Sequence, residues 1–291
     1  MSQAPTIPQQ DRPPWFRKQF GSRFSPAMRQ LLVEYSKIPA AEIDEHIYSI
    51  RERAWQTSPY PCIGGFTFLD FAFAKHPRYK TVLGQLKTEK DDIKFIDIGC
   101  CFGQEVRKLA FDGVSHDRLY GSDIHPELLE LGFELFRDRD RWASATAVAP
   151  SFFPMDIFSP VVPGDIRFDI VYIAMVFHLF SREKQVQAAT EIVTKLLVDK
   201  PGVIILGSQA GTINARSVQS RRHADKASFL HDVDSFKEMW VEVGEMTGTT
   251  WAVDAVLTKP WESPENKEIA EKDRYFVDDD VRWLVFSVVR L

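Results

Sequence analysis

Phe95-Ile-Asp-Ile-Gly-Cys-Cys-Phe-Gly-Gln-Glu105 is the stretch that decides how this chain folds. It begins with an apolar run that closes around Asp97, which is typical of a buried strand. Gly99 and Gly103 allow the chain to turn sharply and to bring its backbone against a ligand. From Gln104 onward the apolar residues recur at helical spacing, so the turn would present unpaired backbone N–H groups at a helix start. The stretch therefore predicts a strand, a turn suited to a ligand, and a helix.

The charge of Asp97 bears on which cofactor such a turn would hold. A dinucleotide places its pyrophosphate on the helix N-terminus, normally through a G-x-G-x-x-G motif, and a carboxylate facing the same space would repel it. S-adenosylmethionine carries an ammonium group, a carboxylate and a sulfonium but no phosphate. An acid beside backbone donors therefore favours S-adenosylmethionine. An ordinary strand-to-helix turn is the alternative, because a glycine loop alone is weak evidence.

The same segment resembles the first motif of class I methyltransferases, D/E-x-G-x-G-x-G. The sequence departs from that motif at Cys101, which stands in the second glycine position. The resemblance implies that S-adenosylmethionine binds at this turn. It implies a first set of cofactor-binding residues: Asp97, Gly99, Cys101, Gly103 and Gln104.

Two further acids follow short apolar segments downstream. Asp123 ends a second predicted strand, and Pro126 then begins a helix as a first-turn proline. An acid at that strand tip can accept both ribose hydroxyls, although a helix N-cap is the alternative. Asp156 follows a third short strand, where its family counterpart lies beside the adenine amino group; a turn aspartate is the alternative. We add the neighbouring Ile124 and Ile157 to the predicted cofactor site.

The rest of the chain predicts alternating strands and helices. The long apolar run of residues 168–180 is typical of a central strand covered on both faces. Further elements are predicted as a helix at 181–198, a strand at 203–207, a helix at 232–246, and strands at 251–257 and 281–289. This order predicts a doubly wound, Rossmann-like α/β sheet, with ligands outside the carboxyl ends of its strands. The two late strands resemble the antiparallel ending of class I methyltransferases. The charged segment 259–280 between them is expected to be mobile.

We expect two regions, with residues 1–92 forming an N-terminal helical cap and substrate lid and residues 93–291 binding S-adenosylmethionine. The start of the chain, through Pro14, is polar, lacks the layout of a signal peptide and is expected to be disordered. Two helices are expected next, one near Ser25 and one across residues 43–54. Aromatic residues are frequent in this region, which as a group favours a bulky hydrophobic small molecule as substrate over a peptide or nucleic acid. Packing of the cap onto the sheet is the alternative for each of them.

The segment Ser58-Pro-Tyr-Pro-Cys-Ile-Gly-Gly-Phe66 and the D-I-G-C-x-F-G-Q form of the first motif resemble a fungal group of methyltransferases. These act in meroterpenoid and related secondary-metabolite pathways, where a carboxylic acid is often converted to its methyl ester. The resemblance implies that Tyr60 lies near the cofactor and Ile63 near the substrate. A rigid turn between helices is the alternative.

The chemistry of the acceptor separates two forms of methyl transfer. A carboxylic acid with a pKa of about 4 is already ionised near neutral pH, so it needs no protein base. A phenol or alcohol would need one, and His178 is the candidate, unless it packs in the core or grips a substrate carboxylate. Gln209 and Arg216 are placed after the fifth strand and are predicted to contact the substrate. Together with Arg221 and Arg222, Arg216 would steer an acid inward or form a solvated face.

Composition narrows the class of protein. The net charge of −5 argues against a nucleic-acid partner, and the longest apolar run contains Asp169 and is too short for a membrane span. Three cysteines form neither a disulfide framework nor a zinc pattern, which indicates a reducing, cytoplasmic compartment and no metal. The aromatic cap predicts a homodimer. A nicotinamide-dependent reductase and a non-catalytic cofactor-binding protein are the alternatives of other classes.

Overall fold

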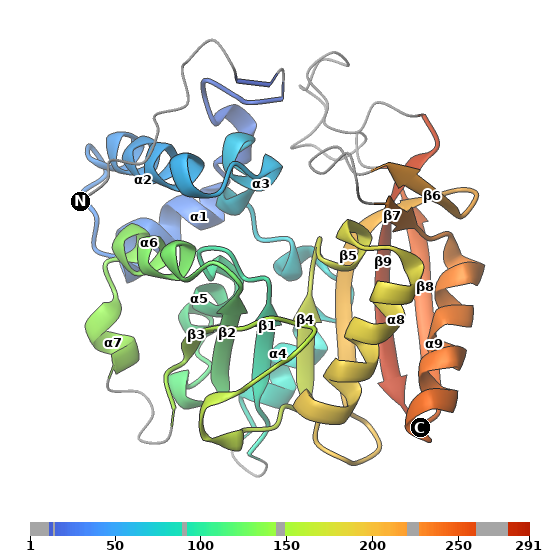
Figure 1. Ribbon diagram of the computed structural model, residues 1–291. Helices are drawn as coiled ribbons and strands as arrows, with labels where there is room; N and C mark the ends of the chain where they lie inside the picture. Colours follow the sequence, from blue (N-terminus) through green and yellow to red (C-terminus); the bar gives the residue numbers. More distant parts are fainter. Residues whose placement is uncertain (1–11, 14, 89–91, 144–148, 220–226, 260–278) are drawn as a thin grey trace.

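The computed structural model describes residues 12–13, 15–88, 92–143, 149–219, 227–259 and 279–291. Its centre is a seven-stranded sheet with the strand order β3-β2-β1-β4-β5-β9-β8 (Figure 1). The strands are β1 Phe95–Ile98, β2 Leu119–Asp123, β3 Phe152–Pro154, β4 Ile170–Ile173, β5 Ile204–Thr212, β8 Trp251–Thr258 and β9 Val281–Arg290. Strands β1 to β5 run parallel, and β9 is antiparallel to both of its neighbours. This is the predicted α/β fold with its antiparallel ending.

The register of the central strands brings their carboxyl ends to one edge. Ile98, the last residue of β1, pairs with Ser122 of β2 on one side and with Ile173 of β4 on the other. All residues of β1, β2 and β4 are buried, because helices cover both faces of the sheet. Side chains that follow these strands therefore meet at the same edge.

Two layers of helices cover the sheet. On one face, α8 (Arg182–Glu191) and α9 (Val233–Thr247) pack against Ile96, Val171 and Ile205. On the other face, α4 (Tyr79–Leu86) and α5 (Gln104–Phe111) pack against alternate strand residues that include Phe95 and Ile170. Because Asp97 shares the strand face of Phe95, its side chain lies on the α5 side of the sheet.

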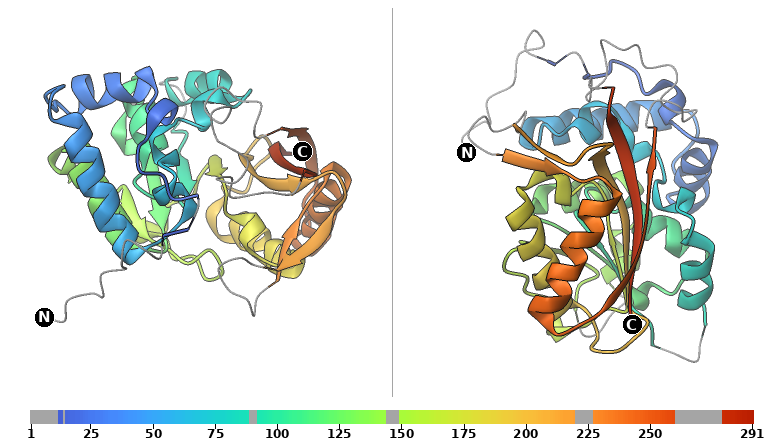
Figure 2. Two further views of the ribbon diagram at one scale, coloured as in Figure 1. Left: turned by 90° about the horizontal axis from the view of Figure 1, so that it is seen from above. Right: turned by 90° about the vertical axis from the view of Figure 1, so that its right-hand side faces the viewer.

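A further group of helices sits over the β1–β3 end of the sheet (Figures 1 and 2). It comprises α1 (Pro26–Gln30), the π-helical turn η3 (Leu31–Tyr35), α2 (Ile43–Thr57) and α3 (Pro61–Gly64), and it packs on α6 (Pro126–Phe136), which α7 (Arg139–Ala143) follows. Helix α4 is separate from this group, since it belongs to the sheet's own helix layer. We call residues 15–69 the cap from here on.

The predicted helices and strands are confirmed with small shifts at their ends. Ser25, Ser181 and Asp232 each accept a hydrogen bond from a backbone N–H in the first turn of the helix that they precede. The α-helical part of the predicted 181–198 helix ends at Glu191, and a π-helical turn, η9 (Ile192–Leu196), continues it.

The fifth strand differs from its prediction, because it extends to Thr212 instead of ending near Gly207. It does so by pairing with β9 along its whole length, from Ile204 opposite Val289 to Thr212 opposite Val281. The prediction that Gln209 follows this strand is therefore wrong, because Gln209 lies within it, opposite Leu284. A small antiparallel pair, β6 (Arg216–Gln219) and β7 (Ala227–Leu230), and helix α4 were not predicted at all.

Several expectations concern residues outside the described ones. These are most of the polar start through Pro14, the segment 260–278, and Arg221 and Arg222. Among the described residues, no helix is both long and apolar enough to cross a membrane.

Candidate functional site

The turn after β1 adopts the left-handed conformation three times. The φ angles are +74° at Gly99, +54° at Cys101 and +67° at Gly103. A Cβ atom at Gly99 would lie 2.6 Å from Cγ2 of Val176, and one at Gly103 would lie 2.4 Å from a ring carbon of Phe152. Glycine is therefore required at both positions by conformation and by space. Cys101, at the position of the motif's second glycine, adopts the left-handed conformation despite its side chain.

Asp123 holds this turn against the end of β2. Its two carboxylate oxygens accept hydrogen bonds from the backbone N–H of Cys101 (2.9 Å) and from that of His125 (3.0 Å). The carbonyl of Ser122 accepts from the N–H groups of Gly99 (2.8 Å) and Cys100 (2.9 Å). The structure thus brings the first and second predicted cofactor segments together, as the sequence indicated.

Three buried acids, Asp97, Asp123 and Glu105, lie at and beside this turn. Burial raises the pKa of Asp97 well above its ordinary value, and the nearby charge of Asp123 raises it further. Burial also raises the pKa of Asp123, although its backbone donors partly offset this, and burial together with Asp97 raises the pKa of Glu105. Within the described residues, the carboxylate of Asp97 accepts no hydrogen bond. Such a group gains most from a cationic ligand.

The other predicted cofactor residues are spread around this turn. Gln104 is the first residue of α5, and its buried side-chain oxygen has no hydrogen-bond partner among the described residues. Ile124 is 59% exposed directly after Asp123. Asp156 lies two residues beyond β3 and is exposed, and its carboxylate accepts a hydrogen bond from the N–H of Phe158 (2.9 Å). Ile157 is buried in the core instead of facing the edge.

Tyr60 connects the cap to the end of β2. Its hydroxyl shares a hydrogen bond with Nε2 of His125 (2.8 Å), the residue whose N–H holds Asp123. His125 was not predicted as a site residue, and only its position next to Asp123 and Ile124 signals it. Ile63, predicted to lie near the substrate, is fully buried in the core that the cap forms with α6.

The opposite side of the edge carries the predicted acceptor residues. His178 lies in η8 (Phe177–Leu179), after β4, and burial lowers its pKa to about 4. Gln209 is 1% exposed, and neither its amide nitrogen nor its amide oxygen has a hydrogen-bond partner among the described residues. Arg216 lies in β6 and forms an ion pair with Asp280, whose pKa it lowers, so its charge is already matched within the chain.

Exposed apolar side chains line the same edge. Four of them come after the carboxyl ends of strands and are between 38% and 59% exposed: Ile124 and Ile213 directly follow β2 and β5, and Met175 and Leu179 lie two and six residues after β4. Met175 also has a positive φ angle of +57°, a conformation that non-glycine residues adopt rarely and mostly in turns and functional sites. The edge therefore combines buried acids on one side with apolar surface and buried amide groups on the other.

Comparisons with known proteins agree with this geometry. Residues 15–69 match the family model of the meroterpenoid methyltransferase N-terminal domain, and residues 96–205 match that of a methyltransferase domain. The O-methyltransferase atr3 of Stereocaulon alpinum is 38% identical over 96% of this chain and 76% of its own length. The asnovolin E/chermesin D methyltransferase nvfJ of Aspergillus novofumigatus is 33% identical over 84% of both chains.

A solved structure supports the fold alone. Phosphoethanolamine N-methyltransferase 2 of Haemonchus contortus, in complex with phosphomonomethylethanolamine and S-adenosylhomocysteine, superimposes with a TM-score of 0.50. It covers 84% of this chain and 59% of its own, with 15% sequence identity. The predicted Rossmann-like architecture is thus confirmed by a known methyltransferase.

Proposed function

This chain belongs to the fungal S-adenosylmethionine-dependent O-methyltransferases of secondary metabolism, and we propose that it forms the methyl ester of a hydrophobic small-molecule carboxylic acid. The family supplies the reaction type, which is transfer of the sulfonium methyl group to an oxygen. The acceptor is our inference from the residues around the sheet's carboxyl edge, and it rests first on the buried amide of Gln209, which has no hydrogen-bond partner among the described residues. The low pKa of His178 supports it.

The residues at the glycine turn and at the ends of β1 and β2 fit the cofactor. The buried carboxylate of Asp97, which has no hydrogen-bond donor in the described part of the chain, would hold the cofactor's ammonium group. Asp123 would accept hydrogen bonds from the ribose hydroxyls, and the amide nitrogen of Gln104, at the start of α5, would donate to the cofactor's carboxylate. Ile124, exposed at the end of β2, would pack on the adenine, with Asp156 and Tyr60 nearby.

A base of pKa about 4 is poorly suited to deprotonate a hydroxyl acceptor. His178 is neutral at pH 7, but moving a proton to it from a phenol of pKa about 10 would cost about 8 kcal/mol at 1.36 kcal/mol per pKa unit. General bases work best when their pKa lies near the operating pH. A carboxylate acceptor avoids this cost, because it is ionised before it binds. We therefore infer that the enzyme aligns and desolvates its acceptor without a proton transfer.

The acceptor side of the edge supports the same substrate class. Gln209 presents a buried amide N–H₂ group that has no partner in the part of the chain that the structure describes, and such a group suits a carboxylate oxygen. The exposed side chains of Met175, Leu179 and Ile213 offer an apolar surface for the rest of the molecule. Because Asp280 already pairs with Arg216, we assign the substrate carboxylate to Gln209 first.

Labelled methyl transfer tests the proposal. The protein is incubated with methyl-labelled S-adenosylmethionine and either an apolar polycyclic carboxylic acid or the matched phenol. We expect label only from the acid, released by mild alkali as an ester is. At saturating S-adenosylmethionine, kcat/KM for the acid should stay flat from about pH 6 to about pH 9, because no catalytic base titrates. His178→Gln should keep kcat within about fivefold. An alkali-stable product, or a rise of kcat/KM with pH that His178→Gln abolishes, would contradict the proposal.

We also expect the enzyme to work in the cytoplasm as a homodimer. Its three cysteines are all free thiols, as a reducing compartment favours. Analytical ultracentrifugation of the purified chain measures the oligomeric state directly.

A further inference from the structure

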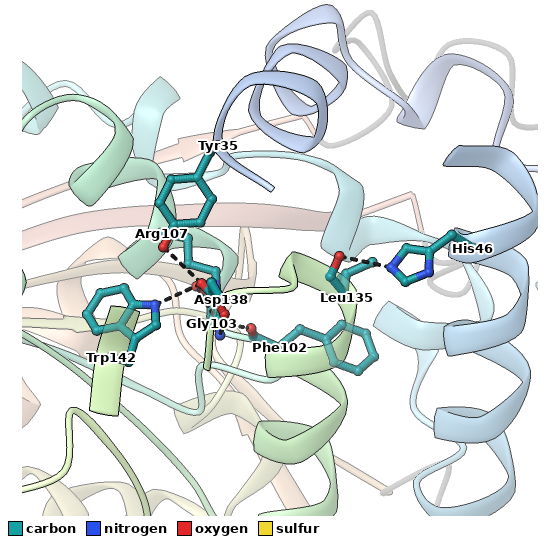
Figure 3. A network of polar contacts seen from close by, with 8 residues as sticks. All are labelled: Tyr35, His46, Phe102, Gly103, Arg107, Leu135, Asp138 and Trp142. Atoms are coloured by element: carbon teal, nitrogen blue, oxygen red, sulfur yellow. Dashed lines mark hydrogen bonds and ion pairs between the residues drawn. The ribbon is translucent and has the colours of Figure 1, made fainter. Parts of the chain in front are cut away.

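Arg107 is buried inside the half of the molecule that holds the glycine turn. Its side chain is 1% exposed, and it forms a two-pronged ion pair with Asp138, which is fully buried (Figure 3). Nε donates to Oδ2 at 2.6 Å, and Nη2 donates to Oδ1 at 2.9 Å. The rings of Phe136 and Phe152 lie 4.6 and 4.5 Å from the guanidinium carbon. A buried ion pair of this kind does not by itself show a gain in stability, so the other contacts of its two side chains matter.

The remaining nitrogen of Arg107 reaches the glycine turn. Nη1 donates to the carbonyl of Phe102 at 2.6 Å, and the carbonyl of Gly103 lies 3.4 Å away. These are the last two peptide groups before α5, directly after the strained Cys101. A cation on these carbonyls fixes the orientation of their peptide planes. Arg107 therefore contacts the turn at Phe102 and Gly103, whereas Asp123 contacts it at the N–H of Cys101.

Asp138 connects the same pair to the cap. Its Oδ2 atom also accepts hydrogen bonds from the hydroxyl of Tyr35 (2.9 Å) and from Nε1 of Trp142 (2.8 Å). Tyr35 ends η3 in the cap, and its pKa is raised by burial and by Asp138, so it stays a protonated donor. Figure 3 shows these groups converging on Asp138, with the cap contact of His46 to the carbonyl of Leu135 beside them. The carboxylate of Asp138 thus accepts hydrogen bonds from the cap, from α5 and from α7.

We propose that Arg107 and Asp138 are positioning residues for the cofactor, which hold the glycine turn in its binding form and, through Tyr35, make cofactor affinity depend on how the cap is docked. Neither residue touches the reacting atoms. Their effect passes through the peptide groups of Phe102 and Gly103. A purely structural role would instead lower the stability of the fold and leave the affinity of the folded protein unchanged.

A second tyrosine provides a matched control. Tyr79 of α4 donates its hydroxyl to Asp112 directly after α5, at the opposite end of the helix from the glycine turn. Its pKa is also raised by burial and by its aspartate partner. Tyr79→Phe and Tyr35→Phe therefore remove the same kind of bond, from a tyrosine hydroxyl to a carboxylate. Only the carboxylate that Tyr35 contacts, Asp138, is paired with Arg107, whose Nη1 bonds the glycine turn.

The test measures the Kd of S-adenosylhomocysteine by calorimetry, the melting temperature, and the KM and kcat for S-adenosylmethionine in the full chain. We expect Tyr35→Phe to raise Kd and KM by about tenfold, the usual worth of one hydrogen bond to a charged group, with kcat within about twofold. Tyr79→Phe should lower the melting temperature about as much as Tyr35→Phe does, and it should leave Kd within about twofold. Arg107→Lys, which keeps the charge but loses the fork, should weaken binding more than Tyr35→Phe.

The proposal is overturned if Tyr35→Phe binds S-adenosylhomocysteine as the unchanged protein does, or if Tyr79→Phe weakens binding as much. If Arg107→Lys does not fold, the two tyrosine variants still decide. Binding of S-adenosylhomocysteine requires no acceptor, so this result is independent of whether the acceptor is a carboxylic acid.

Discussion

Two groups of buried polar side chains near the sheet's carboxyl edge differ in whether they have hydrogen-bond partners. On the β1–β3 side, the charges of Arg107 and Asp138 are matched and carry further hydrogen bonds from Tyr35 and Trp142. On the β5 side, the whole amide of Gln209 is buried with no partner among the described residues. Nε2 of the fully buried His231 also has no partner among them. The polar atoms of the Arg107–Asp138 cluster are therefore partnered, whereas those of Gln209 and Nε2 of His231 are not partnered within the described residues.

This difference separates structure from binding. A buried polar group without a partner costs about 1–3 kcal/mol, so a fold keeps one only where something compensates. Partnered groups can be explained by the folded chain alone. Unpartnered ones such as Gln209, and the acid Asp97 on the cofactor side, are where a ligand supplies the missing partner. Single substitutions should therefore divide into those that lower stability and those that lower affinity.

Asp97→Asn should give the largest effect, a loss of cofactor affinity of about 100-fold, because it removes a buried carboxylate that would bind the cofactor's ammonium. Its stability should not fall. Burial and Asp123 raise the pKa of Asp97, so the folded chain holds its proton more tightly than the unfolded chain does, and folding stability declines as pH rises above about 4. The melting-temperature advantage of Asp97→Asn should therefore grow between about pH 5 and about pH 8. Calorimetry and thermal unfolding measure the two effects.

Asp169→Asn is the control for Asp97→Asn on the same sheet. Asp169 precedes β4, accepts from the N–H of Lys94 (2.9 Å) and pairs with Lys200, so its partners are all within the chain. This variant should lose stability and keep cofactor affinity within about twofold. Equal losses of affinity in both variants would mean that Asp97 does not contact the cofactor.

Gln209→Leu should lower kcat/KM for the acceptor by about tenfold and leave the Kd of S-adenosylhomocysteine within about twofold. Replacing an unpartnered amide by an apolar side chain of similar size removes a desolvation cost, so the melting temperature should stay equal or rise. Gln185→Leu is the matched variant, because the amide nitrogen of Gln185 donates to the carbonyls of Phe180 (3.0 Å) and Phe229 (2.9 Å), and only its amide oxygen has no partner among the described residues. It should show a lower melting temperature. If the two variants behave alike, the partnered and unpartnered groups do not differ in role.

Local patterns were enough to predict the framework of the site. The apolar run before Asp97, the glycines after it and the proline at position 126 each determine conformation over a few residues, so the strand ends and helix starts were placed correctly. The caps at Ser181 and Asp232 were equally local. Because parallel strands end at one edge, these local predictions also placed Asp97 and Asp123 together.

What was missed depends on pairing between distant residues. Arg107 and Asp138 lie 31 positions apart, and Arg216 and Asp280 lie 64 positions apart, so neither ion pair has a local signal. The position of Gln209 inside β5 depends on the length of β9, which is paired to it by the fold. Sequence therefore indicated which residue types gather at the edge, while only the structure distinguishes the partnered from the unpartnered ones.

Substitutions at Cys101 should give the smallest effects. They test whether the glycine turn tolerates a side chain in the left-handed conformation. A left-handed conformation costs a non-glycine residue about 1–2 kcal/mol, whereas glycine loses about 0.5–1 kcal/mol through its freer unfolded chain. These terms nearly offset each other, so Cys101→Gly should change the free energy of unfolding by about 1 kcal/mol at most and cofactor Kd by about threefold at most. Cys101→Val should be worse in both, because β-branched residues are true outliers at positive φ. Urea unfolding and calorimetry rank the three side chains. Equal behaviour of valine and glycine would show that the bonds from Asp123 and Arg107 do not hold the turn left-handed at this position.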